Sequence, residues 1–215
     1  MTDLTALLDQ LSALHPRLCP RQILGVRMGL YAGDVLELEV PRTEDKRLLV
    51  FSETDGCFAD GVSVATGCWV GRRTLRIVDF GKTAAVFVDT ETGRAVRVRP
   101  HPAARERASR AAPRATSRWH AYLEGYATLP ANALLLAEDV LLTTPVDAIV
   151  GQPGVRVECA RCGEEIMNRR EVHVGRAVVC AGCAGGAYYI GTTRAQSTPL
   201  RMGEGGDDRR ADLSH

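Results

Sequence analysis

Residues 75–99 read LRIVDFGKTAAVFVDTETGRAVRVR, and this stretch decides the fold class that the sequence predicts. It contains three short runs of apolar and β-branched residues, at Leu75–Asp79, Ala84–Asp89 and Ala95–Arg99. A short loop that contains a glycine separates each run from the next. Such loops between such runs are typical of hairpins. The stretch therefore predicts an antiparallel sheet meander.

The segments on both sides of this stretch predict helices that flank the sheet. Leucines at helical spacing predict an amphipathic helix over residues 3–14. Pro20 suits the first turn of a second helix, because its missing N–H would be unpaired there, and we expect that helix to run to about Tyr31 and to end at Gly33. Further helices are expected at Cys57–Thr66, Ala103–Ala127 and Asn132–Leu141, and further strands at Asp34–Val40 and Leu48–Phe51. Together these elements predict an α+β fold.

Composition and charge narrow the class of protein. The chain has 215 residues, and 45% of them are hydrophobic, which is enough for a packed core. The charged fraction of 25% is the usual value of a soluble protein. The net charge of +1 gives no overall field that attracts nucleic acid or an acidic membrane. The first fourteen residues lack the basic start of a signal peptide, and the most apolar window, Ala131–Leu142, is interrupted by Glu138 and Asp139. We expect a cytoplasmic protein with reduced thiols and no membrane partner.

Four of the seven cysteines form two C-x-x-C pairs, Cys159 with Cys162 and Cys180 with Cys183. The separation of the pairs falls within the roughly 15–20 residues that are typical of structural zinc sites. Four thiolates arranged as a tetrahedron suit Zn(2+) and leave no open position for catalysis. Two disulfides or idle thiols are the alternative.

The C-x-x-C pairs also divide the chain. We expect a core domain over residues 1–150, a small zinc-ribbon or treble-clef-like module over 151–192 that the metal stabilises, and a disordered tail over 193–215.

A second candidate site lies in the core domain. Cys19 directly precedes Pro20, so it is expected at the N-cap of the second helix, where the helix dipole favours a thiolate. Cys19, His15 and Asp60 are candidate catalytic residues. A second transition metal is expected to use four soft or imidazole ligands: His15, Cys19, Cys57 and Cys68. The alternative is that these cysteines are buried packing residues.

Several motifs resemble the FmdE family, which takes its name from one of the subunits of formylmethanofuran dehydrogenase. The segments His15–Pro20 (HPRLCP) and Gly25–Gly29 (GVRMG) resemble its opening motif. Glu53–Cys57 and Asp60–Cys68 resemble its second block, and Asp79–Lys82 resembles its D-x-G-K turn. The C-x-x-C module is similar to the zinc-binding extension of many members.

The resemblance implies a core that dimerises, a polar cluster near His15 and Cys19 where members hold a metal, and a link to molybdenum or tungsten chemistry with metalloenzyme partner subunits. The sequence departs from the motif at Pro16, which replaces a glycine, and at Arg17, which replaces a histidine. Arginine stays protonated and cannot ligate a metal. We therefore expect a reactive Cys19 thiolate more firmly than a core metal.

The sequence favours a zinc-binding protein that is accessory to, or derived from, a molybdenum or tungsten metalloenzyme system. The alternatives are a stand-alone metal- or cysteine-dependent enzyme, and a nucleic-acid or protein adaptor that uses the zinc module. Residues 94–118 contain eight arginines against one acid, Glu106. We expect this stripe to be a solvated face, because it lacks aromatic residues for stacking on bases. Trp119, Tyr122 and Tyr126 are expected to pack against the core.

Overall fold

The computed structural model describes residues 3–15, 17–150 and 154–190. Contacts divide the chain into two compact units, Met1–Gly151 and Gln152–His215. The tail expected over residues 193–215 lies outside the described residues. Among the described residues, no helix has the length and apolar character needed to cross a bilayer.

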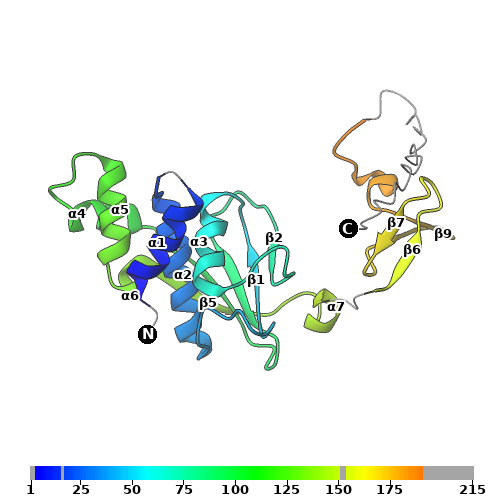
Figure 1. Ribbon diagram of the computed structural model, residues 1–215, viewed down its shortest axis with the longest axis horizontal. Helices are drawn as coiled ribbons and strands as arrows, with labels where there is room; N and C mark the ends of the chain where they lie inside the picture. The colour runs from blue at the N-terminus through cyan, green and yellow to red at the C-terminus, as the bar shows by residue number, and fades with distance from the viewer. Residues whose placement is uncertain (1–2, 16, 151–153, 191–215) are drawn as a thin grey trace, which may run out of the picture. The chain divides into compact units, whose positions relative to one another are not determined.

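The first unit is built on a mixed five-stranded sheet with helices against it, which confirms the α+β class (Figure 1). Its strands lie in the order β2-β1-β3-β4-β5. They are β1 (Leu48–Ser52), β2 (Leu75–Ile77), β3 (Ala85–Asp89), β4 (Ala95–Pro100) and β5 (Leu135–Val140). The pairs β1–β3, β3–β4 and β4–β5 are antiparallel, whereas β2 pairs parallel with β1.

The predicted hairpin between β2 and β3 is wrong, because β1 lies between these two strands. The connection after β2 passes the end of β1 instead of turning directly into β3. Its N–H groups at Val78 and Phe80 donate to the carbonyls of Ser52 (2.8 Å) and Glu53 (2.9 Å). The hairpin between β3 and β4 is present as predicted.

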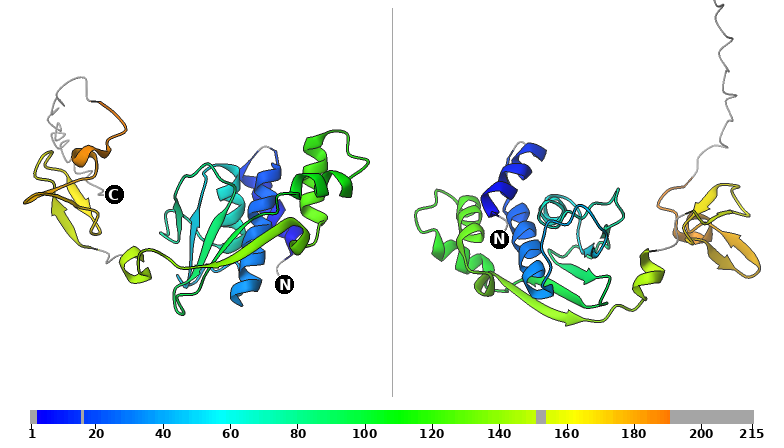
Figure 2. Two further views of the ribbon diagram at one scale, coloured as in Figure 1. Left: turned by 180° about the vertical axis from the view of Figure 1, so that it is seen from behind. Right: turned by 60° about the horizontal axis from the view of Figure 1, so that its bottom comes forward.

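The helix expected at Asn132–Leu141 is also wrong. A single helical turn, α6 (Ala131–Leu134), is followed directly by β5, which pairs with β4 along its whole length and leads on towards α7 (Figure 2). The free edge of β4 offers backbone partners that a helix at this position would leave unpaired. The Arg97–Glu138 pair, 3.0 Å between Nη1 and Oε1, joins the two strands across this register.

Helix α2 (Pro20–Leu36) is longer than predicted, and Asp34–Val40 is not a strand. Gly33 lies inside the helix, where a Cβ would be 2.9 Å from the Val40 side chain, so this glycine gives room for the returning chain. The helix ends at Glu37, whose φ of 57° is left-handed. The helices α1 (Leu4–Leu14) and α3 (Cys57–Thr66) lie where the sequence predicted them.

Close contact between α2 and α3 places the start of each helix beside the other. A Cβ on Gly25 would lie 2.4 Å from the Phe58 carbonyl oxygen, and one on Gly61 would lie 2.1 Å from the Gln22 carbonyl oxygen. The two helices cover one face of the sheet, and α1 packs on them through Leu7 and Leu11 (Figure 1). The glycine spacing therefore permits an approach that side chains would block.

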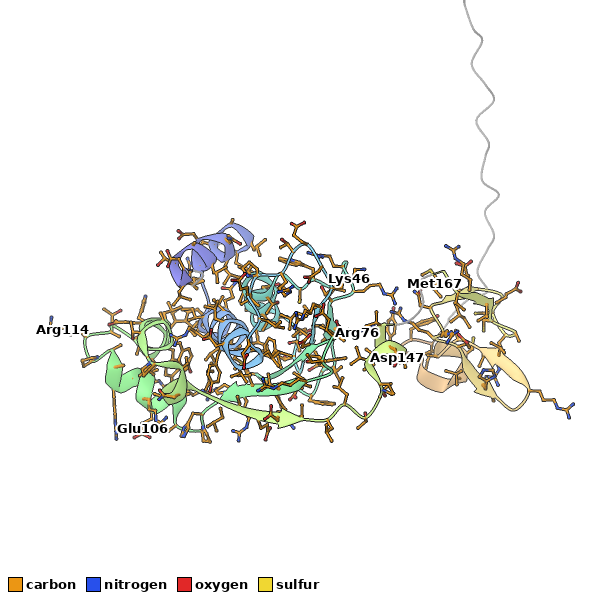
Figure 3. The ribbon with its side chains drawn as sticks, turned by 90° about the horizontal axis from the view of Figure 1, so that it is seen from below. Lys46, Arg76, Glu106, Arg114, Asp147 and Met167 are labelled. Atoms are coloured by element: carbon orange, nitrogen blue, oxygen red, sulfur yellow. The ribbon has the colours of Figure 1, made fainter. Side chains whose placement is uncertain are left out.

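The remaining helices of this unit complete its core. The stretch expected to be helical over Ala103–Ala127 forms two helices, α4 (Ala104–Ala111) and α5 (Arg118–Thr128), with Pro113 between them. On the opposite face of the sheet, the short α7 (Val146–Val150) packs near Leu49 and Val88. Arg76 donates to the Ile149 carbonyl and so ties β2 to α7 (Figure 3).

The second unit consists of two hairpins and a helical turn. The strands are β6 (Arg156–Glu158), β7 (Glu165–Met167), β8 (Val172–Val174) and β9 (Ala177–Val179), followed by η1 (Gly182–Gly186). Gly175 has a φ of 63° in the turn of the hairpin between β8 and β9. Its buried apolar cluster is small and centres on Cys159, Ile166 and Val179.

Candidate functional site

Two backbone turns in the second unit aim four cysteines at one point. Cys159 and Cys162 lie in the turn between β6 and β7, whereas Cys180 directly follows β9 and Cys183 lies in η1. The turns are closed by Gly163 N–H, which donates to the Cys159 carbonyl, and by Ala184 N–H, which donates to the Cys180 carbonyl, both at 2.9 Å. All four Sγ atoms lie within 4.8 Å of one another.

Backbone N–H groups also point at the sulfurs. Cys180 N–H donates to Cys159 Sγ at 3.2 Å, and Cys183 N–H donates to Cys180 Sγ at 3.3 Å. Hydrogen bonds from the backbone, that of Cys162 first and then that of Cys180, lower the pKa of the Cys159 thiol to about 6. Hydrogen bonding with the neighbouring thiols, that of Cys180 first and then that of Cys162, raises the pKa of Cys183 to about 12. Several thiolates this close repel one another, so a cation is needed to hold all four ionised.

The donor set fits a metal ion on chemical grounds. Four sulfurs at about 2.3 Å from a central zinc are about 3.8 Å apart in a tetrahedron. The Sγ atoms of Cys162 and Cys180 are 4.0 Å apart. Within residues 3–15, 17–150 and 154–190, no other group of three or more His, Cys, Asp or Glu residues brings its ligand atoms this close together.

The core candidates gather at the starts of α2 and α3, with one exception. His15 Nε2 lies 2.7 Å from Asp60 Oδ2, so the chain before α2 is tied to the first turn of α3. Cys19 is the N-cap of α2, as the sequence predicted, and Cys57 is the first residue of α3. Burial, and then the neighbouring Cys19 thiol, raise the pKa of Cys57.

Cys68 is the exception, because the structure does not bring it to this group. It follows the far end of α3, about 15 Å along the helix from Cys57 at 1.5 Å per residue. Its buried Sγ donates to the Leu48 carbonyl at 3.3 Å, and burial raises its pKa. Cys68 is thus a packing residue that links α3 to β1.

Two residues, one in the opening motif and one between its two segments, have roles that the sequence did not predict. Arg27 donates to the carbonyls of Tyr126 (3.0 Å), Ala127 (2.7 Å) and Leu129 (2.6 Å), so it caps the end of α5 from α2. Gln22 is fully buried, and its Oε1 accepts the Cys19 N–H at 2.7 Å. The spacing of Cys19 and Gln22, N-cap to N3, is that of a capping box and could have indicated the second role.

Cys19 and Cys57 lie in the wall of a cavity of about 770 Å³ in the first unit. Three further groups of residues line it: the turn after β2, including Lys82; the end of β4, including Arg97 and Arg99; and the facing sides of α4 and α5. Glu53, nearly buried, receives two hydrogen bonds from Arg97 at 2.6 and 2.8 Å, which lower the pKa of this carboxyl.

The fold and these sites define a class of protein: an α+β unit with a thiol-lined cavity, joined to a small unit whose four cysteines could hold a metal ion. The family model described as "FmdE, Molybdenum formylmethanofuran dehydrogenase operon" matches residues 14–136, which is more than half of the chain. The chain belongs to the FmdE family.

Two further proteins are similar to part or most of this chain. A "tungsten formylmethanofuran dehydrogenase subunit e (fmde)-like protein" from Syntrophus aciditrophicus has a similar crystal structure, with a TM-score of 0.56 and 20% sequence identity; the match covers 88% of this chain and 96% of the other. At this identity the likeness shows a shared fold. A "Probable S-adenosyl-L-methionine-binding protein" of Archaeoglobus fulgidus is 36% identical over 99 residues, which are 45% of this chain. The match covers 27% of the length of that curated relative.

Proposed function

We propose that this FmdE-family protein binds one structural zinc through Cys159, Cys162, Cys180 and Cys183. The observation that carries the proposal is the convergence of four Sγ atoms within 4.8 Å, because four thiolates are a donor set that suits Zn²⁺. All four positions would come from the protein, so the metal would have a structural role. The requirement for four reduced thiols also supports a cytoplasmic location.

The small size of the second unit supports a metal-dependent fold. Its buried cluster centres on three residues, which is too little apolar burial to offset the conformational entropy of folding. Bound zinc would supply that free energy, since it binds the folded ligand set far better than the unfolded chain.

Elemental analysis of the full chain tests the proposal. We expect one zinc per chain after purification without chelator, and loss of most of that zinc in the Cys162→Ser variant. Cys68→Ser is the matched control, because Cys68 lies in the first unit, where its thiol bonds to Leu48. Zinc-free protein, or an unchanged zinc content in the Cys162→Ser variant, contradicts the proposal.

We further propose that the protein acts as an accessory component of a molybdenum or tungsten metalloenzyme system. This rests on the family description and on the name of the Syntrophus protein. Mixing the purified chain with a purified formylmethanofuran dehydrogenase complex tests it. Co-elution at a fixed ratio on gel filtration supports the role, whereas separate elution with unchanged dehydrogenase activity contradicts it.

The cavity wall favours a second candidate, a stand-alone enzyme that uses Cys19 or a core metal. Cys19 and Cys57 lie together in a cavity, beside the His15–Asp60 pair. A second metal per chain, or a fast alkylation of Cys19 at neutral pH, supports this candidate. The Arg17→His variant distinguishes an enzyme that uses the Cys19 thiol from one that uses a core metal. If this variant binds a metal that the parent does not bind, the core site is a family metal centre that Arg17 has disabled.

A homodimer formed through the first unit is also proposed. The edge strand β2 and the turn after it expose Ile77, Val78 and Phe80, and such apolar surface is commonly covered by a partner. Sedimentation of the full chain should give a dimer, and the Phe80→Glu variant should shift it towards monomer. A monomeric parent contradicts the proposal.

A further inference from the structure

The cavity of the first unit has a wall that the proposed zinc and accessory roles do not use. It lies where β4 ends and where α2, α3 and α4 begin, as shown by the lining residues Pro20, Cys57, Pro100 and Ala104. Its volume of about 770 Å³ falls within the roughly 300–1,000 Å³ of small-molecule sites. The cavity can therefore hold a whole small molecule.

The wall is strongly basic. Five cationic residues line it: Arg21, Lys82, Arg97, Arg99 and Arg105. None of the described residues that line it is acidic. Glu53 and Glu138 pair with Arg97, whereas the other four cations form no ion pair within the described residues. Like charges that share a cavity repel one another, so an anionic ligand would relieve that repulsion.

A buried donor beside the first turn of α2 adds a second observation. Gln22 has 0% of its surface exposed, and its Nε2 has no hydrogen-bond partner within the described residues. Its Oε1 is already used by the Cys19 N–H, and Cys19 lies in the cavity wall. A buried donor without an acceptor costs about 1–3 kcal/mol in general. Gln22 does not itself line the cavity, so this unsatisfied donor lies behind the wall, next to Cys19.

The opposite wall is aromatic and consists of Trp119, Tyr122 and Tyr126. The two tyrosine rings stack with their centroids 5.6 Å apart and their planes 10° apart. Tyr126 is buried, as the sequence predicted, but Trp119 is 50% exposed and offers a free ring surface at the cavity. Flat ligand rings stack favourably on such side chains.

We propose that this cavity binds a nucleoside phosphate, whose phosphates contact the three arginines and the lysine that form no ion pair within the described residues and whose base lies against Trp119. Arg99 and Arg105 of this site belong to the arginine stripe of residues 94–118, which we expected to be a solvated face. Planar, fixed-charge guanidinium groups suit phosphate oxygens because they can donate two parallel hydrogen bonds.

Calorimetric titration of the full-length protein tests the proposal with ADP, adenosine, pyrophosphate and S-adenosylmethionine. We expect ADP to bind at least tenfold more tightly than each of the other three. Adenosine lacks the anion, pyrophosphate lacks the base, and S-adenosylmethionine carries a cationic sulfonium. The ADP affinity should fall as salt is raised from about 50 to about 500 mM, since screening weakens charge contacts.

Variants locate the site. Arg99→Gln and Arg105→Gln should each weaken ADP binding about tenfold, the loss expected for one charge-assisted phosphate contact. Arg110→Gln is the matched control on α4, because Arg110 pairs with Glu106 (2.7 Å), which points outward from that helix (Figure 3). Trp119→Ala should weaken ADP binding but leave pyrophosphate binding unchanged.

Three binding results with the parent protein would overturn the proposal. They are the absence of ADP binding at millimolar concentration, equal affinities of ADP and pyrophosphate, and tighter binding of S-adenosylmethionine than of ADP. An ADP affinity that Arg99→Gln and Arg105→Gln leave unchanged would overturn it as well. Thermal melts of each variant show whether a lost affinity comes from lost folding, and in that case the Trp119→Ala comparison still decides.

Discussion

Replacing Gly61 by alanine tests the close contact between α2 and α3 on which the core site depends. An added Cβ would lie 2.1 Å from the Gln22 carbonyl oxygen and 2.9 Å from its carbonyl carbon. Both obstacles are backbone atoms, so they cannot rotate away as a flexible side chain could. The helices would have to separate by about 1.4 Å to lengthen the 2.1 Å contact to about 3.5 Å.

The expected cost follows from this displacement. Forcing an extra methyl group into a packed core costs about 1–3 kcal/mol, and a backbone obstacle places Gly61→Ala at the upper end. Alanine gains about 1 kcal/mol over glycine in a helix, which offsets part of that cost. The net loss is about 2 kcal/mol in the free energy of unfolding, or a fall of about 4–8 °C in Tm at 2–4 °C per kcal/mol.

Tryptophan fluorescence during thermal unfolding measures this change, because Trp69 and Trp119 both belong to the first unit. Gly71→Ala is the matched control, since its Cβ would meet no atom within 4 Å, and its Tm should stay within about 2 °C of the parent value. A Gly61→Ala variant that melts with the parent or above it would refute the inferred helix contact.

Three further changes have defined outcomes. A hydrogen bond from Arg47 is the main cause that lowers the pKa of Asp89 from 3.8 to about 2, which corresponds to about 2 kcal/mol of stability that is present above pH 4 and lost as the pH falls towards 2. The Tm difference between the parent and Asp89→Asn should therefore be constant from pH 5 to 7 and vanish near pH 2; a difference that persists at pH 2 contradicts this. Arg27→Met removes three hydrogen bonds to the end of α5 and should lower the unfolding free energy by about 2–3 kcal/mol in denaturant titration, and an unchanged midpoint would mean that water replaces the guanidinium. Under native conditions, mass spectrometry should find Cys19 alkylated well before buried Cys68, and equal rates would place Cys68 at the surface.

Local patterns determined much of this protein. The leucine spacing of α1 and the proline at the start of α2 each act within one turn of helix, so they predict helix positions without knowledge of the rest of the chain. The two C-x-x-C pairs are equally local, because each turn fixes two sulfurs in a knuckle of four residues. The class of fold and the candidate metal ligands therefore follow from the sequence.

Local patterns do not predict which strands, distant in sequence, pair with each other. The insertion of β1 between β2 and β3, and the addition of β5 to the free edge of β4, depend on which backbone edges remain unpaired after the core has assembled. An apolar run such as Leu134–Val140 satisfies a helix or a strand equally well until such an edge is available. The apparent stop signal at Gly33 failed for a similar reason, since that glycine makes room for Val40.

The cavity shows the same division. The sequence predicted Cys19 at the N-cap of α2 and showed the arginines of residues 94–118, but it did not predict that Cys19 and some of these arginines line one cavity. Strand alternation and helix periodicity describe only the face of one element at a time. Only the tertiary structure brings the ends of β4, α2, α3 and α4 together. It also moves Cys68 away from Cys57, because α3 is a rigid rod that separates its two ends. The sequence by itself determines the chemistry of each residue. The packing of whole helices and strands decides which of these residues share one cavity.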